Sequence, residues 1–318
     1  MLNTSRISLE RIQAAAQIID PVFLHSPQFV CEPLSAALGC ELWLKIETMN
    51  PIRSFKGRGA DLLVANADPA QPLLCASAGN FGQAMAYACR KRGIPLTVYA
   101  SVQANPLKIE RMRQLGAEVV LYGEDFDAAK REARRVAAAQ QARFVEDSLD
   151  IETVEGAGTI GLELLAIDPP LDVLLIALGN GALCNGIAHA VKQIRPRTHV
   201  IAVQAAGAPA MVESWRSGQI VEYDQIATIA DGIGVRIPVP VALQDLEGQI
   251  DDALLVQEET IIAAMRMLHE HAGVVVEPSG AVGVAALLEH TERFHDLRVG
   301  TIVCGGNLTT VQMRMWLG

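Results

Sequence analysis

A lysine at position 56 stands in a segment whose residue types could support covalent chemistry. Ser54 is a good helix-capping residue, and the apolar spacing that follows predicts a helix over 55–66 with Lys56 in its first turn. There the helix dipole disfavours the charged ammonium form, and we interpret Gly57 and Gly59 as space for a planar group. Such a lysine can form a Schiff base with a carbonyl group, although structural ion pairs also use lysines of this kind.

Glycine-containing turns between a predicted strand and a predicted helix could bind a small ligand. Each could offer backbone N–H groups to an anion, and each could equally be an ordinary connecting turn. An asparagine amide in the first turn could hold a ring hydroxyl, and the second turn suits a phosphate. A cysteine opens the third, where a buried thiol is most often only a small apolar residue. The turns are Ser77-Ala78-Gly79-Asn80-Phe81, Gly179-Asn180-Gly181-Ala182-Leu183 and Cys304-Gly305-Gly306-Asn307.

Strand and helix signals alternate along nearly the whole chain. This alternation predicts an α/β fold of open, mostly parallel sheets, in which ligands bind beyond the carboxyl ends of the strands. Strands are predicted at 42–46, 73–77, 96–100, 118–122, 143–146, 173–178, 199–203 and 299–304. Helices are predicted at 55–66, 83–92, 106–116, 126–141, 158–167, 186–194, 259–271 and 280–290.

The composition narrows the classes of function. The chain has 318 residues, half of them hydrophobic, and a net charge of −10. The negative charge argues against nucleic acid or an anionic membrane as the main partner, and no apolar stretch is long enough to span a bilayer. The N-terminus lacks the apolar core of a signal peptide. The six cysteines show neither metal-ligand spacing nor a disulfide framework, so we expect reduced thiols in a cytoplasmic protein.

The order of the motifs resembles that of the fold-type-II pyridoxal-phosphate enzymes, which include serine and threonine dehydratases, serine racemase, threonine synthase and cysteine synthase. The resemblance extends over about 19–308 and is closest to the dehydratases, the ammonia-lyases of amino-acid metabolism. It implies two twisted sheets flanked by helices: a large domain (1–70 and 148–318) and a smaller mobile domain (71–147) that closes over substrate. The motifs are SFKGRGA at 54–60, ASAGN at 76–80, the segment 105–119, GNGAL at 179–183, ADGI at 230–233, EPSGA at 277–281 and CGGN at 304–307.

The resemblance also implies roles for individual residues. Lys56 would bind pyridoxal 5'-phosphate as a Schiff base and later move the α-proton of the substrate. Phe55 and Gly232 would pack against the cofactor ring, and Cys304 would face its nitrogen. Asn80 would hold the ring hydroxyl. The loop Gly179-Asn180-Gly181-Ala182-Leu183 would bind the phosphate, and the turn Ser77-Ala78-Gly79-Asn80-Phe81 would receive the substrate carboxylate.

Two residues indicate which reaction the cofactor would support. A thiol at Cys304 is less able than a carboxylate to keep the ring nitrogen protonated, which favours loss of a β-substituent over transamination. Ala78 replaces the hydroxyl residue of serine racemases and cannot move a proton, so racemisation is the less favoured alternative, with Ser77 keeping it open. We therefore expect β-elimination on a small hydroxy amino acid such as L-serine or L-threonine, giving a 2-oxo acid and ammonia.

Departures from the dehydratase pattern keep other functions open. Arg53 stands where dehydratases usually have Gly, and the preceding Asn50-Pro51 resembles the cysteine-synthase branch. Both would fit a β-replacement synthase of the cysteine-synthase or threonine-synthase kind. A non-catalytic binding or sensing protein is a further alternative. Gln204 stands where many relatives have a metal-binding glutamate, so no tightly held divalent metal ion is expected, and a monovalent ion on carbonyl oxygens is left open. Family members are often dimers, and we expect a homodimer that uses a small amino-acid substrate.

Overall fold

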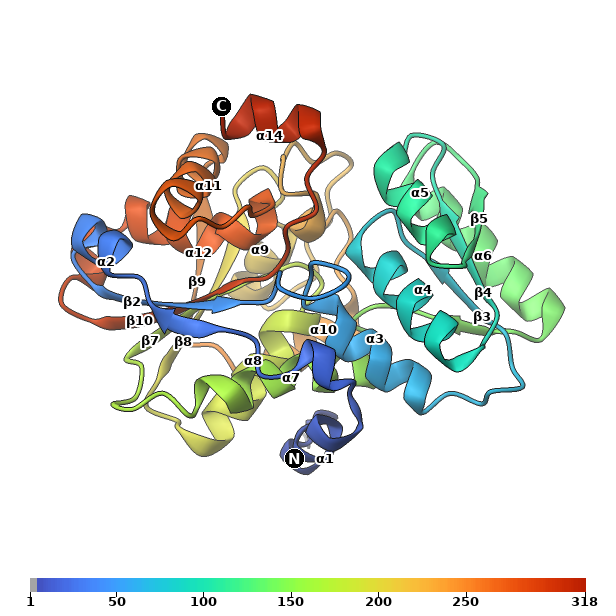
Figure 1. Ribbon diagram of the computed structural model, residues 1–318, viewed down its shortest axis with the longest axis horizontal. Helices are drawn as coiled ribbons and strands as arrows, with labels where there is room; N and C mark the ends of the chain where they lie inside the picture. The colour runs from blue at the N-terminus through green and yellow to red at the C-terminus, as the bar shows by residue number, and fades with distance from the viewer. Residues whose placement is uncertain (1–4) are drawn as a thin grey trace.

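A computed structural model describes residues 5–318, and it contains two separate sheets that are each flanked by helices (Figure 1). The larger sheet has the strand order β1-β2-β10-β7-β8-β9. Every pairing in it is parallel except that between β1 and β2. These strands are β1 (Gln28–Val30), β2 (Glu41–Ile46), β7 (Val173–Ala177), β8 (His199–Ala205), β9 (Asp252–Val256) and β10 (Arg298–Val303).

The smaller sheet is formed entirely by the segment between positions 73 and 145. Its strand order is β5-β4-β3-β6, and all of its pairings are parallel. Two open, mostly parallel sheets confirm the predicted fold class. The limits of the smaller domain and its mobility stay a prediction. The elements are β3 (Leu73–Ala76), α4 (Asn80–Arg92), β4 (Leu96–Ala100), α5 (Pro106–Gln114), β5 (Glu118–Leu121), α6 (Phe126–Gln140) and β6 (Arg143–Val145).

Helices cover both faces of the larger sheet, with α11 and α12 on one side and α7 and α8 on the other (Figure 1). The helices outside the smaller sheet are α1 (Leu9–Ile18), α2 (Glu32–Leu38), α3 (Lys56–Ala65), α7 (Ile151–Leu164), α8 (Ala182–Ile194), α9 (Ala210–Ser217), α10 (Pro240–Leu246), α11 (Glu258–Ala272), α12 (Pro278–Glu289), α13 (Thr291–Phe294) and α14 (Thr310–Trp316). Two short 3-10 helices are η1 (Pro21–Phe23) and η2 (Asp231–Ile233).

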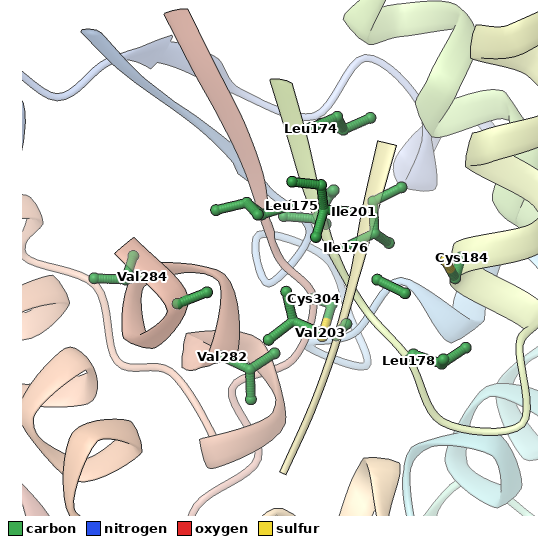
Figure 2. Close-up of a cluster of buried hydrophobic side chains, with 14 of the residues drawn as sticks. Leu174, Leu175, Ile176, Leu178, Cys184, Ile201, Val203, Val282, Val284 and Cys304 are labelled. Atoms are coloured by element: carbon green, nitrogen blue, oxygen red, sulfur yellow. The ribbon is translucent and has the colours of Figure 1, made fainter. Parts of the chain in front are cut away.

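The apolar core of the larger sheet surrounds its central strand. Every residue of β7 is buried, as expected for a parallel strand covered on both faces. Side chains of β7, β8 and α12 meet in this core, and Figure 2 shows Cys304 among them. The carboxyl end of the strand β10 therefore emerges from a rigidly packed layer.

Close contacts at glycines of α7 and of its neighbour α8 explain why α7 begins seven residues before the predicted start. A side chain at Gly156 would lie 2.6 Å from the Cα of Gly59, and one at Gly186 would lie 2.1 Å from the carbonyl oxygen of Val154. These glycines let α7 cross α3 and α8 at close range, so they mark helix contacts and not breaks. The prediction that Gly59 leaves space for a planar ligand is wrong, because its open side faces Thr153 of α7.

In the part of the chain that the structure describes, no helix combines the length and the apolar character needed to cross a bilayer.

Candidate active site

A cleft of about 350 Å³ lies between the two sheets and receives residues from both of them. Every residue that the sequence analysis assigned to the site lines this cleft. The lining includes Phe55, Lys56, Ser77, Ala78, Gly79, Asn80, Phe81, Gly179, Asn180, Gly181, Ala182, Leu183, Gly232 and Cys304. Segments that are far apart in the sequence thus meet at one place, beyond the carboxyl ends of β3, β7 and β10.

Lys56 is the first residue of α3 and directs its amine into the cleft. Its Nζ donates to Oδ2 of Asp147 at 2.5 Å and lies 4.5 Å from the centre of the Phe55 ring. Ser54 was predicted to cap the helix, but the N-cap residue is Phe55. The Ser54 hydroxyl accepts a hydrogen bond from the backbone N–H of Lys56 at 3.3 Å, so it supports the first turn from one position earlier.

Gly57 does not provide room for a ligand either. A Cβ at Gly57 would lie 2.2 Å from the ring of Phe23. The glycine therefore allows α3 to approach the segment that contains η1. Both glycines beside Lys56 serve helix packing, and this corrects the sequence interpretation.

A buried charge network fixes α3 just after the lysine. The guanidinium of Arg58 is fully buried and donates to carboxylate oxygens of Glu47 and Glu163 at 2.6–3.0 Å. The Nζ of Lys45 also donates to Glu163, at 2.5 Å. Burial alone would raise the pKa of Glu163, but Arg58 and Lys45 lower it from 4.5 to about 2. These two cations and two anions hold the helix that carries Lys56.

The turn after β3 forms the start of α4. This helix begins at Asn80, three residues before the predicted start. The hydroxyl of Ser77 accepts hydrogen bonds from the backbone N–H groups of Gly79 and Gly82 at 3.2 and 2.9 Å. Ser77 thereby shapes the turn that leads into α4, at the positive end of the helix dipole. Such an end suits a carboxylate.

Asn80 belongs to a polar network that sequence reasoning did not predict. Its Nδ2 donates to Oε1 of Glu277 at 2.6 Å, and its Oδ1 accepts from Nδ2 of Asn307 at 2.8 Å. Burial raises the pKa of Glu277 above its usual range, while the nearby charge of Lys108 opposes the shift.

The loop after β7 is a cradle of small residues at the start of α8. Gly181 has a φ of +95°, and a Cβ there would lie 2.6 Å from Nδ2 of Asn185. Asn180 and Ala182 do not adopt positive φ, so the loop accommodates these non-glycine residues without backbone strain. The helix begins at Ala182, not at 186, and the backbone N–H of Ala182 donates to Oγ of Ser148 at 3.2 Å.

Cys304 and Ser279 lie together at another side of the cleft. The Sγ of Cys304 is 3.7 Å from the carbonyl oxygen of Ser279, and burial raises the pKa of the thiol, so it stays neutral. The hydroxyl of Ser279 is buried and has no hydrogen-bond partner within residues 5–318. It lies 2.8 Å from the position that a Cβ would take at Gly232.

Sequence reasoning gave no role in the site to several charged residues of the cleft, among them Asp147 and Lys108. Asp147 pairs with Lys56, as described above. Lys108 of α5 is buried, and its Nζ donates to Oδ2 of Asp231 in η2 at 2.6 Å, which links the smaller sheet to the larger unit. Lys108 stands in the segment 105–119, which the resemblance includes without giving this lysine a role, and no local pattern indicated Asp147.

Gln204 occupies the position where a metal-binding carboxylate was considered. Its Oε1 accepts a hydrogen bond from the backbone N–H of Val212 at 3.1 Å, at the start of α9. The side chain is fully buried. Over residues 5–318, no three His, Cys, Asp or Glu side chains gather closely enough to hold a metal ion.

Comparison with known proteins places this chain in a family. Residues 21–305 match the family model of the pyridoxal-phosphate dependent enzymes. The chain is 35% identical over 305 residues to L-threonine ammonia-lyase of Thermotoga maritima, covering 95% of this chain and 76% of the relative.

Solved structures agree with the sequence match. The processed form of threonine deaminase isoform 2 from Solanum lycopersicum is 29% identical with a TM-score of 0.89, and the match covers 98% of this chain and 94% of that one. Maize serine racemase is 28% identical with a TM-score of 0.91, covering 97% and 96%. The chain therefore belongs to the pyridoxal-phosphate dependent enzymes, in the fold-type-II branch that resembles the serine and threonine dehydratases.

Proposed function

We propose that this protein is a pyridoxal-phosphate dependent ammonia-lyase that converts L-threonine or L-serine into a 2-oxo acid and ammonia. The observation that supports it best is the cleft, which is lined by Lys56, by the turns 77–81 and 179–183, and by Cys304. In the reaction the Cα–H and Cβ–O bonds break and a carbon–carbon double bond forms as water leaves. Hydrolysis of the resulting enamine's imine tautomer then releases ammonia and the 2-oxo acid.

The residues present fit the cofactor. The small-residue cradle 179–183 at the start of α8 suits a phosphate, because its N–H groups lie at a positive helix end. At another side of the cleft, Ser279 offers a buried hydroxyl without a partner, next to the neutral thiol of Cys304. Lys56 carries the amine that the cofactor aldehyde requires. When bound, the cofactor supplies an electron sink for the electrons of the Cα–H bond.

We assign the remaining roles to residues of this chain as follows. Phe55 and Gly232 would pack against the ring, and the side-chain amide of Asn80 would hold the ring hydroxyl. Backbone N–H groups of the turn 77–81 bind the substrate carboxylate at the start of α4. The Nζ of Lys56 accepts the α-proton. Phe81 is buried beside this turn and makes the substrate side of the cleft more apolar.

Ala78 supports elimination over racemisation. Racemisation needs a proton donor on each face of the substrate, and a methyl group cannot provide one. The neighbouring Ser77 hydroxyl already accepts hydrogen bonds from two backbone N–H groups. This arrangement favours a structural role for Ser77.

A substrate screen tests the proposal directly. The holoenzyme is mixed with L-threonine, L-serine and their D-isomers, and 2-oxo acid and ammonia are measured together. We expect equimolar products from an L-hydroxy amino acid and none from the Lys56→Ala variant. Formation of a new amino acid from an added thiol, with little 2-oxo acid, would replace this proposal with β-replacement.

We also propose that the enzyme is a cytoplasmic homodimer. Exposed apolar side chains at Ile18, Val22 and Phe29 offer surface for a second copy. All six cysteines are free thiols and buried, which suits a reducing compartment. Light scattering on the purified holoenzyme measures the mass, and a monomer at micromolar concentration would exclude the dimer.

A further inference from the structure

Asp147 is a carboxylate in the cleft to which neither the sequence motifs nor the proposed reaction assigns a task. It follows the strand β6, two positions after Val145. Its Oδ2 accepts a hydrogen bond from Nζ of Lys56 at 2.5 Å. Its Oδ1 is buried, and no group in residues 5–318 donates to it. The pair is largely shielded from water, because 16% of the Lys56 side chain and 28% of the Asp147 side chain are exposed.

The neighbouring carboxylate, Glu146, is arranged differently. It pairs with both Lys130 and Arg134 of α6, so its charge is balanced inside the smaller sheet unit. Asp147 instead pairs across the cleft with the lysine of α3. The two adjacent acids therefore have different partners although they lie next to each other in the sequence. For this reason, substitution of Glu146 is a suitable control for substitution of Asp147.

Other ionisable groups around the cleft do not substitute for Asp147. Lys108 pairs with Asp231, and Glu277 accepts hydrogen bonds from Asn80 and Asn307. The thiol of Cys304 is neutral because burial raises its pKa. The ionisable side chains that line the same cleft are Lys56, Lys108, Lys130, Glu146, Asp147, Asp231, Glu277 and Cys304.

We propose that Asp147 is a positioning residue for Lys56, which holds the Nζ atom toward the cleft and stabilises the protonated state of its nitrogen. The start of α3 disfavours a cation through the helix dipole. A carboxylate in direct contact opposes this effect, more strongly where water is excluded. The inference rests on the proposed role of Lys56 as the residue that takes the α-proton, because the ammonium formed in that step is the state that Asp147 favours.

The cofactor-free protein gives a readout that does not depend on turnover. Lysines are labelled with trace acetic anhydride from pH 6 to 11, and the peptide that contains Lys56 is quantified by mass spectrometry. In Asp147→Asn we expect the labelling midpoint to fall by about one pH unit, which is about a tenfold faster reaction at a pH below the midpoint. Glu146→Gln removes the same charge one residue away and should leave the midpoint within a few tenths of a unit.

The holoenzyme gives the second readout. The absorbance of the cofactor bound at Lys56 is titrated with pH, and the pH profiles of kcat and kcat/KM are measured with the best substrate. In Asp147→Asn we expect the absorbance midpoint and the acidic limb of kcat to move to lower pH. The maximal kcat should fall about tenfold with KM nearly unchanged, because Asp147 acts on the transfer of the α-proton to Lys56 and not on substrate binding. Asp147→Glu should restore part of the shift.

The outcomes separate this inference from the proposed function. Asp147→Asn with unchanged labelling and absorbance midpoints, in a protein whose circular dichroism matches the wild type, would overturn the role of Asp147. The same would follow if Glu146→Gln shifted both midpoints equally. If no hydroxy amino acid is converted but both midpoints shift as expected, the proposed substrate fails while Asp147 still controls Lys56.

Discussion

Replacing Glu163 by glutamine should destabilise the fold because it removes one anion from the buried network around Arg58. The network contains two cations, Arg58 and Lys45, and two anions, Glu47 and Glu163. The pKa of Glu163 is lowered from 4.5 to about 2, and at about 1.4 kcal/mol for each pKa unit this difference corresponds to about 3 kcal/mol of stability at pH 7. Removing one partner of a buried pair typically costs about 3–5 kcal/mol. We therefore expect Glu163→Gln to lower the free energy of unfolding by about 3–5 kcal/mol.

The pH dependence gives this prediction a defined sign. Because the folded pKa of Glu163 is depressed, its contribution is complete above the unfolded value of 4.5 and is lost as the pH falls toward about 2. Roughly half of it, about 1.5 kcal/mol, should be gone at pH 3.5. Between pH 7 and pH 3.5, the free energy of unfolding of the wild type should therefore fall by about 1.5 kcal/mol more than that of Glu163→Gln.

Urea unfolding measures both effects. Unfolding of the holoenzyme and of Glu163→Gln is followed by tryptophan fluorescence, in which Trp43 of β2 reports on the larger sheet. The surface variant Glu132→Gln is the control, because Glu132 pairs with Arg135 on exposed α6 and should change stability little. A loss below about 1 kcal/mol for Glu163→Gln, with a pH dependence parallel to the wild type, would refute the reasoning.

Other substitutions test packing and chemistry around the cleft. Gly186→Ala would place a Cβ 2.1 Å from the carbonyl oxygen of Val154, and thermal unfolding should show a loss of about 1–3 kcal/mol; an unchanged melting temperature would contradict the close crossing of α7 and α8. Burial raises the pKa of Glu277, so its contribution to stability is present below pH 4.5 and is lost as the pH rises through the raised value. Glu277→Gln should therefore weaken the fall of the unfolding free energy as the pH rises above 4.5. An unchanged pH dependence would contradict the raised pKa of the buried Glu277 carboxyl group. Cys304→Ser keeps a neutral, weakly polar group and should retain elimination within about tenfold in kcat; complete loss in a folded, cofactor-loaded variant would argue that the thiol itself is required.

Local signals made much of the fold and site predictable from sequence. Buried parallel strands such as β7 and β10 are continuous apolar runs, and the turns that follow them are rich in small residues. The carboxyl ends of parallel strands share one edge of a sheet, so these turns had to lie near one another. The helix after Ser54 then brought Lys56 to the same place.

The helix starts, strands and contacts that the sequence did not predict were missed for other physical reasons. Glycine signals a break in an isolated helix, yet Gly156 and Gly186 allow helices to touch, so α7 and α8 begin earlier than predicted. The three-residue strand β1 is too short to show a period, and acidic residues beside β9 hid its apolar run. Asp147 pairs with a residue 91 positions away in sequence, and no local pattern encodes that contact.

The attachment of the cofactor to Lys56 is the claim on which the account depends most. Reduction of the holoenzyme with borohydride, followed by proteolysis and mass spectrometry, locates any pyridoxyl group on the chain. We predict a pyridoxyl adduct on Lys56 and on no other lysine. An adduct at a different residue, or none after incubation with pyridoxal 5'-phosphate, would contradict the account.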